Sequence, residues 1–455
     1  MSILVLDIGR TNVSVCLVSE DGKLLEHTKI DNKTRTLQGI EVFDTDRIWN
    51  WFLQVLKKTC TSYQPKAIIT TTHAASVALL GVESQNEHRR LLDVLDYESQ
   101  QYACTTDAYE KLRGDYALTG SPSLPKGLNL GRQLFWIQNA KPEIFSKCEW
   151  IIPYPQYWSY LLSGIASSEA SSLGAHTDCW NPYKCSYSTL VKTQGWQSLF
   201  PPIRNAWDTL GPPRREVCEY TGLSPACGIL CGIHDSNAAF TYHYRSDRTT
   251  TLLSTGTWVI GMCATSITPS EELDQLLNIN LLGEILPSFR FMGGREWESL
   301  TKGIEGTPST ELLDELINKR IMALPAFTDQ GGPFRNRPGT IEGTCPTPLH
   351  KKALASLYCA QVSAWCLDNF SVTGQVIIDG PFVNDEIYIA VLARLLPKCE
   401  ILTSTTTHGT ALGAARLAIW PKSFNPEYRR VLGGKGQILS NLDAYHQAWC
   451  KKVLT

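Results

Sequence analysis

The sequence carries no excess of charge of either sign. Its 42 lysine and arginine residues nearly balance 44 aspartate and glutamate residues, which gives a formal net charge of -2 at pH 7. A chain without a basic excess lacks the electrostatic signature of nucleic-acid or anionic-membrane binding. We therefore expect a small-molecule ligand, no nucleic-acid partner and no membrane partner.

Long apolar runs are also missing. No stretch of the sequence approaches the roughly 20 apolar residues that a membrane-spanning helix needs. The first residues show neither the basic segment nor the apolar segment of a secretory signal peptide. These absences predict a cytoplasmic protein.

Cysteine is present, but not at the spacing of a metal-binding motif. The 15 cysteines are an odd number and are scattered through apolar stretches. Cys227 and Cys231 form the closest pair, and no second pair matches them. We expect buried, reduced thiols rather than a disulfide framework.

The length of 455 residues exceeds what one compact core usually holds, so we expect two domains. Strand patterns come first in each half and then alternate with helical patterns, which predicts an α/β fold. We place the domains at residues 1–243 and 244–455. Residues 121–220 are rich in aromatic residues, proline and glycine, and they are predicted to be an insertion that shapes a pocket.

Two short segments of the same design lie about half a chain apart. Residues 7–12 (Asp-Ile-Gly-Arg-Thr-Asn) join apolar strands at 3–7 and 13–18, and residues 254–258 (Ser-Thr-Gly-Thr-Trp) interrupt a strand pattern at 249–263. A glycine-containing turn offers backbone N–H groups to a polyanion without a bulky side chain in the way. The repetition predicts a duplicated fold that holds one phosphate chain from both halves. A plain hairpin turn is the alternative for either copy.

Four motifs occur in a fixed order along the chain. They are Asp-x-Gly-x-Thr at residues 7–11, Gly-x-x-Asp at 232–235, Ser-x-Gly-Thr at 254–257 and Ala-Leu-Gly-Ala-Ala at 411–415. In order and approximate spacing they resemble the FGGY carbohydrate kinases. The resemblance implies a two-domain, actin-like ATPase (ribonuclease H-like) fold, with ATP and sugar in the interdomain cleft. It also implies ATP and Mg²⁺ as cofactors and a sugar as the phosphoryl acceptor.

The resemblance assigns roles to individual residues. Asp235 would be the catalytic base, and Asp7 with Asp235 would hold Mg²⁺. The nucleotide and its phosphates would be bound by Asp7, Gly9, Arg10, Thr11, Asn12, Ser254, Thr255, Gly256, Thr257, Gly380, Asn384 and Gly409. The sugar would be bound by His73, Asp96, His234 and Trp258. Residues 291–296 are predicted to form a pocket lip of undefined role.

Each of these roles has a structural alternative. Asp235 could be an ordinary helix N-cap, and Asp7 could bond to its own turn. Arg10 could point to solvent instead of neutralising phosphate charge. Residues 411–415 are predicted to leave room for a flat base, but the same small residues occur in any tightly packed helix. A buried histidine or tryptophan is more often structural than a ligand contact.

The resemblance also points to a class of sugar. Trp258 after the second turn and His234 before the aspartate are similar to kinases of 6-deoxy-ketohexoses such as L-fuculose and L-rhamnulose. Residues 379–381 (Asp-Gly-Pro) keep only one glycine of the family's usual adenosine turn, and residues 71–74 (Thr-Thr-His-Ala) depart from its sugar-side pattern. A pentulose or polyol kinase of the same family is one alternative. A non-catalytic, actin-like nucleotide-binding regulator is the alternative from another class, and the oligomeric state stays open, a homodimer included.

Overall fold

The computed structural model describes residues 2–84, 87–247, 249–329, 331–335, 337–431 and 441–454. The chain forms two compact units that are not continuous in sequence. The first unit comprises Met1–Tyr242, Leu277–Ile285 and His408–Asn425. The second comprises His243–Leu276, Leu286–Thr407 and Pro426–Thr455.

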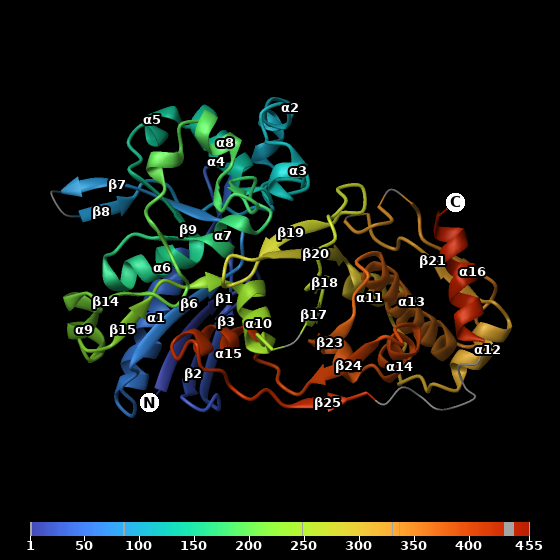
Figure 1. Cartoon of the computed structure of the whole chain (residues 1–455). Coiled ribbons are helices and arrows are strands. Elements are labelled where there is room, and N and C mark those ends of the chain that lie inside the picture. Colours follow the sequence, from blue (N-terminus) through green and yellow to red (C-terminus); the bar gives the residue numbers. More distant parts are fainter. Residues whose placement is uncertain are drawn as a thin grey trace. The chain divides into compact units, whose positions relative to one another are not determined.

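The first unit is built on a mixed sheet that opens with an antiparallel meander (Figure 1). Its strands are β1 (Ser2–Ile8), β2 (Asn12–Ser19) and β3 (Leu24–Asp31). Nearly every residue of β1 is buried, as expected for a strand that is covered on both faces. The strands predicted at residues 3–7 and 13–18 are confirmed.

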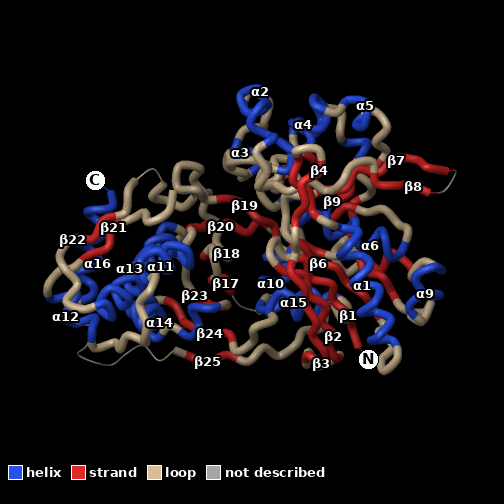
Figure 2. Tube along the Cα trace, turned by 180° about the vertical axis from the view of Figure 1, so that it is seen from behind, coloured by secondary structure: helices blue, strands red, loops and turns tan. Residues whose placement is uncertain are grey.

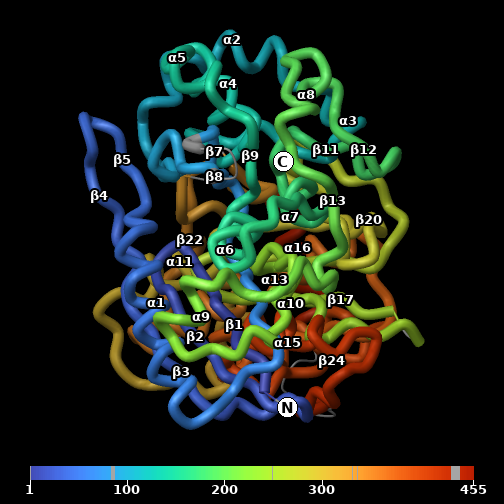
Figure 3. Tube along the Cα trace, turned by 90° about the vertical axis from the view of Figure 1, so that its left-hand side faces the viewer, coloured from blue at the N-terminus to red at the C-terminus, as the bar shows by residue number. Residues whose placement is uncertain are grey.

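Parallel strands extend this sheet beyond β1. They are β6 (Ala67–Thr72), β15 (Gly228–Leu230) and β16 (Ile233–His234), with β14 (Thr209–Gly211) antiparallel at the edge. Helix α1 (Thr45–Cys60) buries Ile48, Phe52 and Leu56 in a core that it shares with β1 and β2. Figure 3 shows β1 and β2 with α1 on one side and with α10 (Asp235–His243) and α15 (Gly409–Leu417) on the other.

Helices α10 and α15 touch through their backbones. A Cβ atom at Gly413 would lie 1.7 Å from the carbonyl oxygen of Ala238, so only glycine permits this crossing. Ala411, Ala414 and Ala415 are buried beside it. The small residues at 411–415 therefore make room for a neighbouring helix, and that they also leave room for a flat base stays a prediction.

An aromatic-rich layer is added to the first unit after β6. Tyr102, Tyr109, Trp136, Trp180 and Trp196 are buried together in one apolar cluster. A linker would not carry such a core, so this region is a structured insertion. Its elements include β7 (Val77–Ser84), β8 (Glu87–Arg90), β9 (Trp150–Pro153), α2 (Thr106–Glu110), α3 (Tyr116–Thr119), α4 (Leu130–Ala140), α5 (Pro142–Phe145), α7 (Ala170–Gly174) and α8 (Thr189–Thr193). Helices α6 (Tyr154–Ser163) and α9 (Arg215–Thr221) instead pack in the core that α1 shares with the main sheet.

The second unit repeats the plan of the first. In its sheet β18 (Val259–Met262) pairs antiparallel with β17 (Thr250–Thr255) and with β20 (Ile285–Phe291). Strands β23 (Gly374–Asp379) and β24 (Cys399–Ser404) continue parallel to β17, and β25 (Tyr428–Arg430) closes the edge. The order β20-β18-β17-β23-β24 thus matches β3-β2-β1-β6-β15. This match confirms the predicted duplication of the fold.

Helices of the second unit gather on one side of strands β17, β18 and β20 (Figure 2). They are α11 (Gly293–Thr301), α12 (Leu312–Asn318), α13 (Pro348–Asn369), α14 (Glu386–Leu395) and α16 (Leu442–Leu454). Helix α13 is buried over most of its length, which explains its apolar character all round. Among the described residues, no helix is both long and apolar enough to cross a membrane.

Short strand pairs complete the structure. They are β4 (Thr34–Leu37) with β5 (Ile40–Phe43), β10 (Ser168–Glu169) with β13 (Ile203–Arg204), β11 (Trp180–Asn181) with β12 (Ser186–Tyr187), and β21 (Met322–Leu324) with β22 (Thr340–Glu342). A further strand, β19, covers Leu276–Ile279.

All 15 cysteines are free, and eight of them are buried.

Candidate active site

Three parallel strands of the first unit end at the same edge of the sheet. In β6, Thr71 is aligned with Asp7 of β1 and with Ile233 of β16, and the next residues along each strand are aligned in turn. Ligands of open α/β sheets bind at the carboxyl ends of parallel strands. This register brings the turn after β1, His73 after β6 and Asp235 after β16 to one edge.

Asp235 is held by the residue that precedes it. His234 Nε2 lies 3.0 Å from Asp235 Oδ1, and Asn237 Nδ2 lies 3.1 Å from His234 Nδ1. Since an amide nitrogen can only donate, the Nδ1 atom accepts and the Nε2 atom is left to donate its proton to Asp235. The backbone N–H of Ser236 donates to the same oxygen at 2.6 Å.

These contacts keep Asp235 ionised. Burial raises the pKa of a carboxyl group, but the interactions with His234, its hydrogen bond included, outweigh burial here and lower the pKa of Asp235 below its usual value. The Asp235 side chain keeps 28% of its surface exposed. An oriented, ionised and accessible carboxylate is suited to accept a proton from a bound hydroxyl group.

Asp7 behaves differently although it lies close by. Burial raises the pKa of Asp7 to about 7, and the negative charge of Asp235 adds to the rise. Two carboxylates that repel each other at a strand edge offer the oxygen donors that Mg²⁺ prefers. The two predicted metal ligands therefore fit a divalent cation by charge and by donor type.

The turn after β1 is tightly closed. The Gly9 N–H donates to the Asn12 carbonyl oxygen at 2.9 Å, and Asn32 Nδ2 donates to the Gly9 carbonyl oxygen at 2.8 Å. The side chains of Thr11 and Asn12 lie at the surface, with Asn12 Nδ2 donating to Thr11 Oγ1 at 3.0 Å. The turn thus presents small polar groups on a fixed backbone.

Arg10 points to a carboxylate of its own unit. Its Nη2 atom lies 2.8 Å from Asp96 Oδ2 and 3.5 Å from Glu98 Oε2. The guanidinium also lies over the rings of Phe43 and Tyr97, at 5.4 and 5.9 Å from their centroids. Asp96 Oδ1 accepts from the Glu98 N–H at 2.9 Å. Both oxygens of Asp96 therefore have partners, and Arg10 links the turn to the 96–98 segment instead of pointing to solvent.

His73 offers an acceptor in an aromatic setting. Its Nδ1 atom lies 2.8 Å from the Ala74 carbonyl oxygen, so this nitrogen carries the proton. Its Nε2 atom is buried, and within the described residues no donor reaches it. Burial lowers the pKa of His73 to about 4, which keeps the ring neutral. The rings of Phe43, Tyr97 and Tyr154 lie 5.0 to 5.3 Å away, and a small cavity lies beside His73 and His234.

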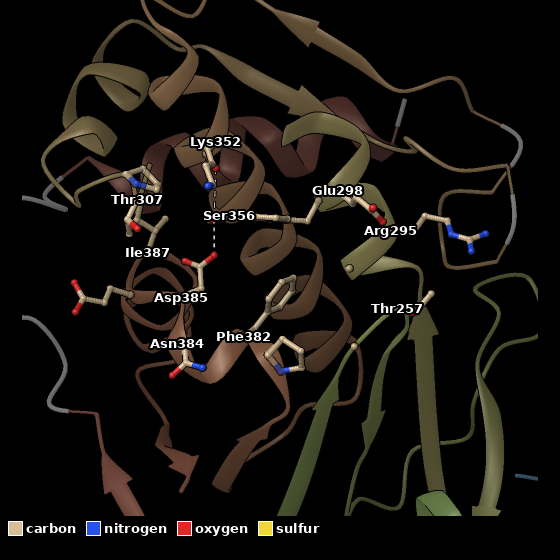
Figure 4. Close-up of a pocket in the computed structure, with 16 residues that line it drawn as sticks. Thr257, Arg295, Glu298, Thr307, Lys352, Ser356, Phe382, Asn384, Asp385 and Ile387 are labelled. Atoms are coloured by element: carbon tan, nitrogen blue, oxygen red, sulfur yellow. Dashed lines mark hydrogen bonds between the residues drawn. The ribbon is translucent and has the colours of Figure 1, made fainter. Parts of the chain in front are cut away.

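The second unit contains a cavity of about 810 Å³. Figure 4 shows its walls, with Lys352 and Ser356 from α13, Arg295 and Glu298 from α11, and Asn384 from the turn before α14. Its full lining is Gly256, Thr257, Gly294, Arg295, Trp297, Glu298, Thr307, Pro308, Lys352, Ser356, Pro381, Phe382, Asn384, Asp385, Glu386 and Ile387. The volume lies in the range of small-molecule and cofactor sites.

Close backbone contacts fix the wall formed by the second turn. Thr255 Oγ1 donates to the Asp379 carbonyl oxygen at 2.6 Å and accepts from the Phe382 N–H at 3.1 Å. Gly380 has a φ of 87°, and a Cβ atom there would lie 1.9 Å from the Thr255 carbonyl oxygen. A Cβ atom at Gly294 would lie 2.0 Å from the Gly256 carbonyl oxygen. Glycine is required at both positions because a backbone occupies the space.

A chain of hydrogen bonds crosses the cavity wall. Trp297 Nε1 donates to Ser356 Oγ at 3.0 Å, and Ser356 Oγ donates to Asp385 Oδ2 at 2.5 Å (Figure 4). The other oxygen of Asp385 accepts from the Tyr388 N–H at 2.9 Å and so caps α14. Lys352 lies over the ring of Trp297 at 5.6 Å. The wall thus combines oriented polar groups with the aromatic rings of Trp297 and Phe382, which suits a ligand with one flat and one polar side.

The structure places the predicted residues of the second half in three ways. Gly256, Thr257 and Asn384 line the cavity, and Ser254, Thr255 and Gly380 form the strand ends next to it. The Arg290 guanidinium lies over the ring of Trp258, 4.9 Å from the ring centroid. Trp258 is not part of the cavity lining. Gly409 begins α15 in the first unit and does not line the cavity either.

Sequence reasoning missed several cavity residues. Arg295 follows the glycine pair in the segment that we predicted to be a pocket lip, and it does line the cavity. Trp297, Lys352, Ser356 and Asp385 lie on helices or helix caps without a motif. The strand–Gly–Gly–helix pattern at 291–296 indicated the part of the wall to which Arg295 belongs, whereas Gly256, Thr257 and Asn384 were predicted from the other motifs.

Comparison with known proteins gives the family. Residues 2–241 match the model of the FGGY family of carbohydrate kinases, N-terminal domain, and residues 247–426 match that of carbohydrate kinase FGGY, C-terminal domain. The crystal structure of a carbohydrate kinase from Novosphingobium aromaticivorans superposes with a TM-score of 0.90 at 31% identity, over 100% of this chain and 98% of that chain.

Two curated relatives are more distant. L-fuculokinase of Haemophilus influenzae is 24% identical over 58% of this chain and 57% of its own length. Rhamnulokinase of Oceanobacillus iheyensis is 25% identical over 56% of this chain and 54% of its own length. The matched regions thus span about half the length of these relatives. The predicted two-domain, actin-like α/β fold is confirmed, and the chain belongs to the FGGY family of carbohydrate kinases.

Proposed function

We propose that this protein is an ATP-dependent kinase that phosphorylates a hydroxyl group of a ketose. The observation that carries the proposal is the His234–Asp235 pair at the carboxyl ends of three parallel strands. Phosphoryl transfer needs positioning, charge neutralisation and a base next to the attacking hydroxyl group. Asp235 meets the last need because it is ionised, oriented and accessible.

In the proposed reaction Asp235 accepts the proton of the sugar hydroxyl group. The sugar oxygen attacks the γ-phosphorus of ATP, the bond from this phosphorus to the β–γ bridging oxygen breaks, and ADP leaves. His234 keeps the carboxylate in place through its Nε2 proton. Asp7 and Asp235 would hold Mg²⁺, which neutralises phosphate charge when it is bound. Thr11 and Asn12 present their polar groups to the phosphates.

We place the nucleoside in the cavity of the second unit. Its volume of about 810 Å³ accommodates a nucleoside. The Gly256 and Thr257 backbone would face the phosphates, and the Ser356–Asp385 hydrogen bond gives the wall fixed polar atoms. Asn384 adds an amide at the cavity edge.

We place the sugar at the strand edge of the first unit. The unpartnered Nε2 atom of His73 can accept a hydrogen bond from a sugar hydroxyl group. The aromatic rings around it supply an apolar wall, which suits the methyl group of a 6-deoxy-ketohexose. The names of the two curated relatives, an L-fuculokinase and a rhamnulokinase, favour the same substrate class.

The experiment is an assay of ADP release with a panel of acceptors and a control without acceptor. We expect L-fuculose or L-rhamnulose to give a higher kcat/KM than D-xylulose, D-ribulose or glycerol. A preference for D-xylulose, D-ribulose or glycerol would make the protein a pentulose or polyol kinase. No acceptor-dependent ADP release with any compound, together with intact ATP binding, would favour a non-catalytic regulator. We propose that the protein acts in the cytoplasm, where ATP is available.

A further inference from the structure

Three soft metal-ligating side chains meet in the first unit, away from any cysteine motif. Cys16 on β2 is directly opposite His27 on β3 in the strand register. His408 immediately precedes α15, far along the chain. The Sγ atom and one nitrogen of each imidazole all lie within 4.8 Å of one another.

The spacing of these atoms suits a small cation. Zinc binds cysteine sulfur at about 2.3 Å and histidine nitrogen at about 2.0–2.1 Å, which places tetrahedral ligand atoms roughly 3.5 Å apart. Side-chain rotations that move the ligand atoms by roughly 1 Å would therefore bring them to the separations of a tetrahedral site. The rings of His27 and His408 meet edge to face with centroids 4.8 Å apart, so both already face the same space.

The surroundings permit entry and retention of an ion. Cys16 is buried, His408 is partly exposed and His27 is exposed. The exposed imidazole leaves a path from solvent, and the buried thiol forms the floor of the site. Three protein ligands leave a fourth position for water.

We propose that Cys16, His27 and His408 form a binding site for one zinc-like divalent cation, distinct from the Mg²⁺ of the proposed reaction. Sulfur and imidazole ligands select zinc and similar metals, whereas Mg²⁺ requires oxygen ligands. The bound ion would join the meander to the beginning of α15. That helix crosses α10 at Gly413, and α10 begins with Asp235. Metal binding thereby stabilises the packing of residues 408–425 in the first unit.

The test uses the full chain, stripped of metal and kept reduced, with Co²⁺ as a spectroscopic probe for zinc. We expect one Co²⁺ per chain, with a thiolate-to-cobalt charge-transfer band and the strong visible bands of a four-coordinate ion. Zinc should displace the cobalt and should raise the Tm of the protein.

Variants assign the ligands. Cys16→Ser should remove the charge-transfer band. His27→Gln changes an exposed side chain and should leave the fold intact, which circular dichroism can verify. It should weaken Co²⁺ binding at least about a hundredfold, because loss of a direct ligand costs more than the 10–100-fold that loss of an outer-shell partner costs. His408→Gln should act in the same way.

A matched control comes from another neighbouring pair. Cys450 Sγ lies 3.5 Å from His446 Nε2 on α16 and supplies two ligands instead of three. Cys450→Ser should leave the stoichiometric Co²⁺ binding unchanged. The proposal is overturned if the wild-type chain binds no stoichiometric Co²⁺, if binding is as tight in Cys16→Ser or His27→Gln as in the wild type, or if it is lost in Cys450→Ser.

Discussion

His234 donates its Nε2 proton to Asp235 Oδ1 across 3.0 Å, while the Asn237 amide fixes the opposite ring nitrogen. One short segment thus supplies all three groups. Asp235 is the base, His234 orients it, and Asn237 sets the tautomer of His234. The strand β16 ends at His234, and α10 begins at Asp235. The carboxylate therefore stands at a strand-to-helix junction, where both neighbours are held by backbone hydrogen bonds.

Asp235→Asn tests the base directly. The amide keeps the size of the side chain but cannot accept the hydroxyl proton, so we expect kcat to fall by about 10²- to 10⁴-fold. Titration calorimetry with an ATP analogue in the absence of Mg²⁺ should give a Kd close to that of the wild type, which separates loss of chemistry from loss of folding. Turnover at the wild-type rate would remove Asp235 from the mechanism.

His234→Gln tests the orienting group through the pH profile. His234 lowers the pKa of Asp235, so its removal should let that pKa rise. Because the ionised carboxylate is the active form, the acidic limb of kcat/KM should move to higher pH, and kcat should fall at every pH. His88→Gln, which changes a histidine paired with Glu149 elsewhere in the unit, should leave the profile in place. An unmoved acidic limb in His234→Gln would contradict this role.

Part of this arrangement was predictable from the sequence. The strands at 3–7, 13–18 and 249–263 follow from apolar runs broken by glycine turns, because these signals are local. The motif order placed Asp7 and Asp235 near phosphate chemistry. The register of β1, β6 and β16 then explains why both carboxylates reach the same edge.

The remaining features depend on contacts between distant segments. Arg10 forms an ion pair with Asp96, which lies 86 positions away, and no local sequence pattern predicts that pair. Gly413 is fixed by the close approach of the backbone of α10, a helix that lies far away in the sequence. Ser356 and Asp385 join across the cavity wall only because α13 and α14 pack together. A local pattern therefore predicts where a turn is, but not which side chain faces it.

Asp7→Asn should make the protein more stable and less active. Burial and the charge of Asp235 raise the pKa of Asp7 to about 7, against 3.8 for the free side chain. From about pH 4 to pH 7 the folded state therefore binds more protons at this site than the unfolded state does, and stability falls as the pH rises. The neutral amide removes this penalty, so urea unfolding at pH 8 should show a gain of about 1 to 3 kcal/mol.

The activity of Asp7→Asn should fall because Mg²⁺ loses a carboxylate ligand. Asp107→Asn, at an exposed position, should change neither quantity. If Asp7→Asn were less stable than the wild type at pH 8, burial of Asp7 would not destabilise its charged form.

Gly380→Ala tests whether the cavity of the second unit holds the nucleotide. An added Cβ atom would lie 1.9 Å from the Thr255 carbonyl oxygen, so the turn beside Phe382 and Asn384 must shift. We expect the KM for ATP to rise at least about tenfold, in line with a loss of 1.4 kcal/mol or more of binding, while the KM for the sugar changes little. Gly303→Ala is the matched control, because Gly303 also has a positive φ of 77° but no atom of the described residues lies within 4 Å of the added Cβ. A side chain is strained at this positive φ as well, but the steric clash is absent, so the KM for ATP should stay at the wild-type value. Equal effects of the two substitutions on that KM would mean that general strain, and not the shape of the cavity, controls ATP binding.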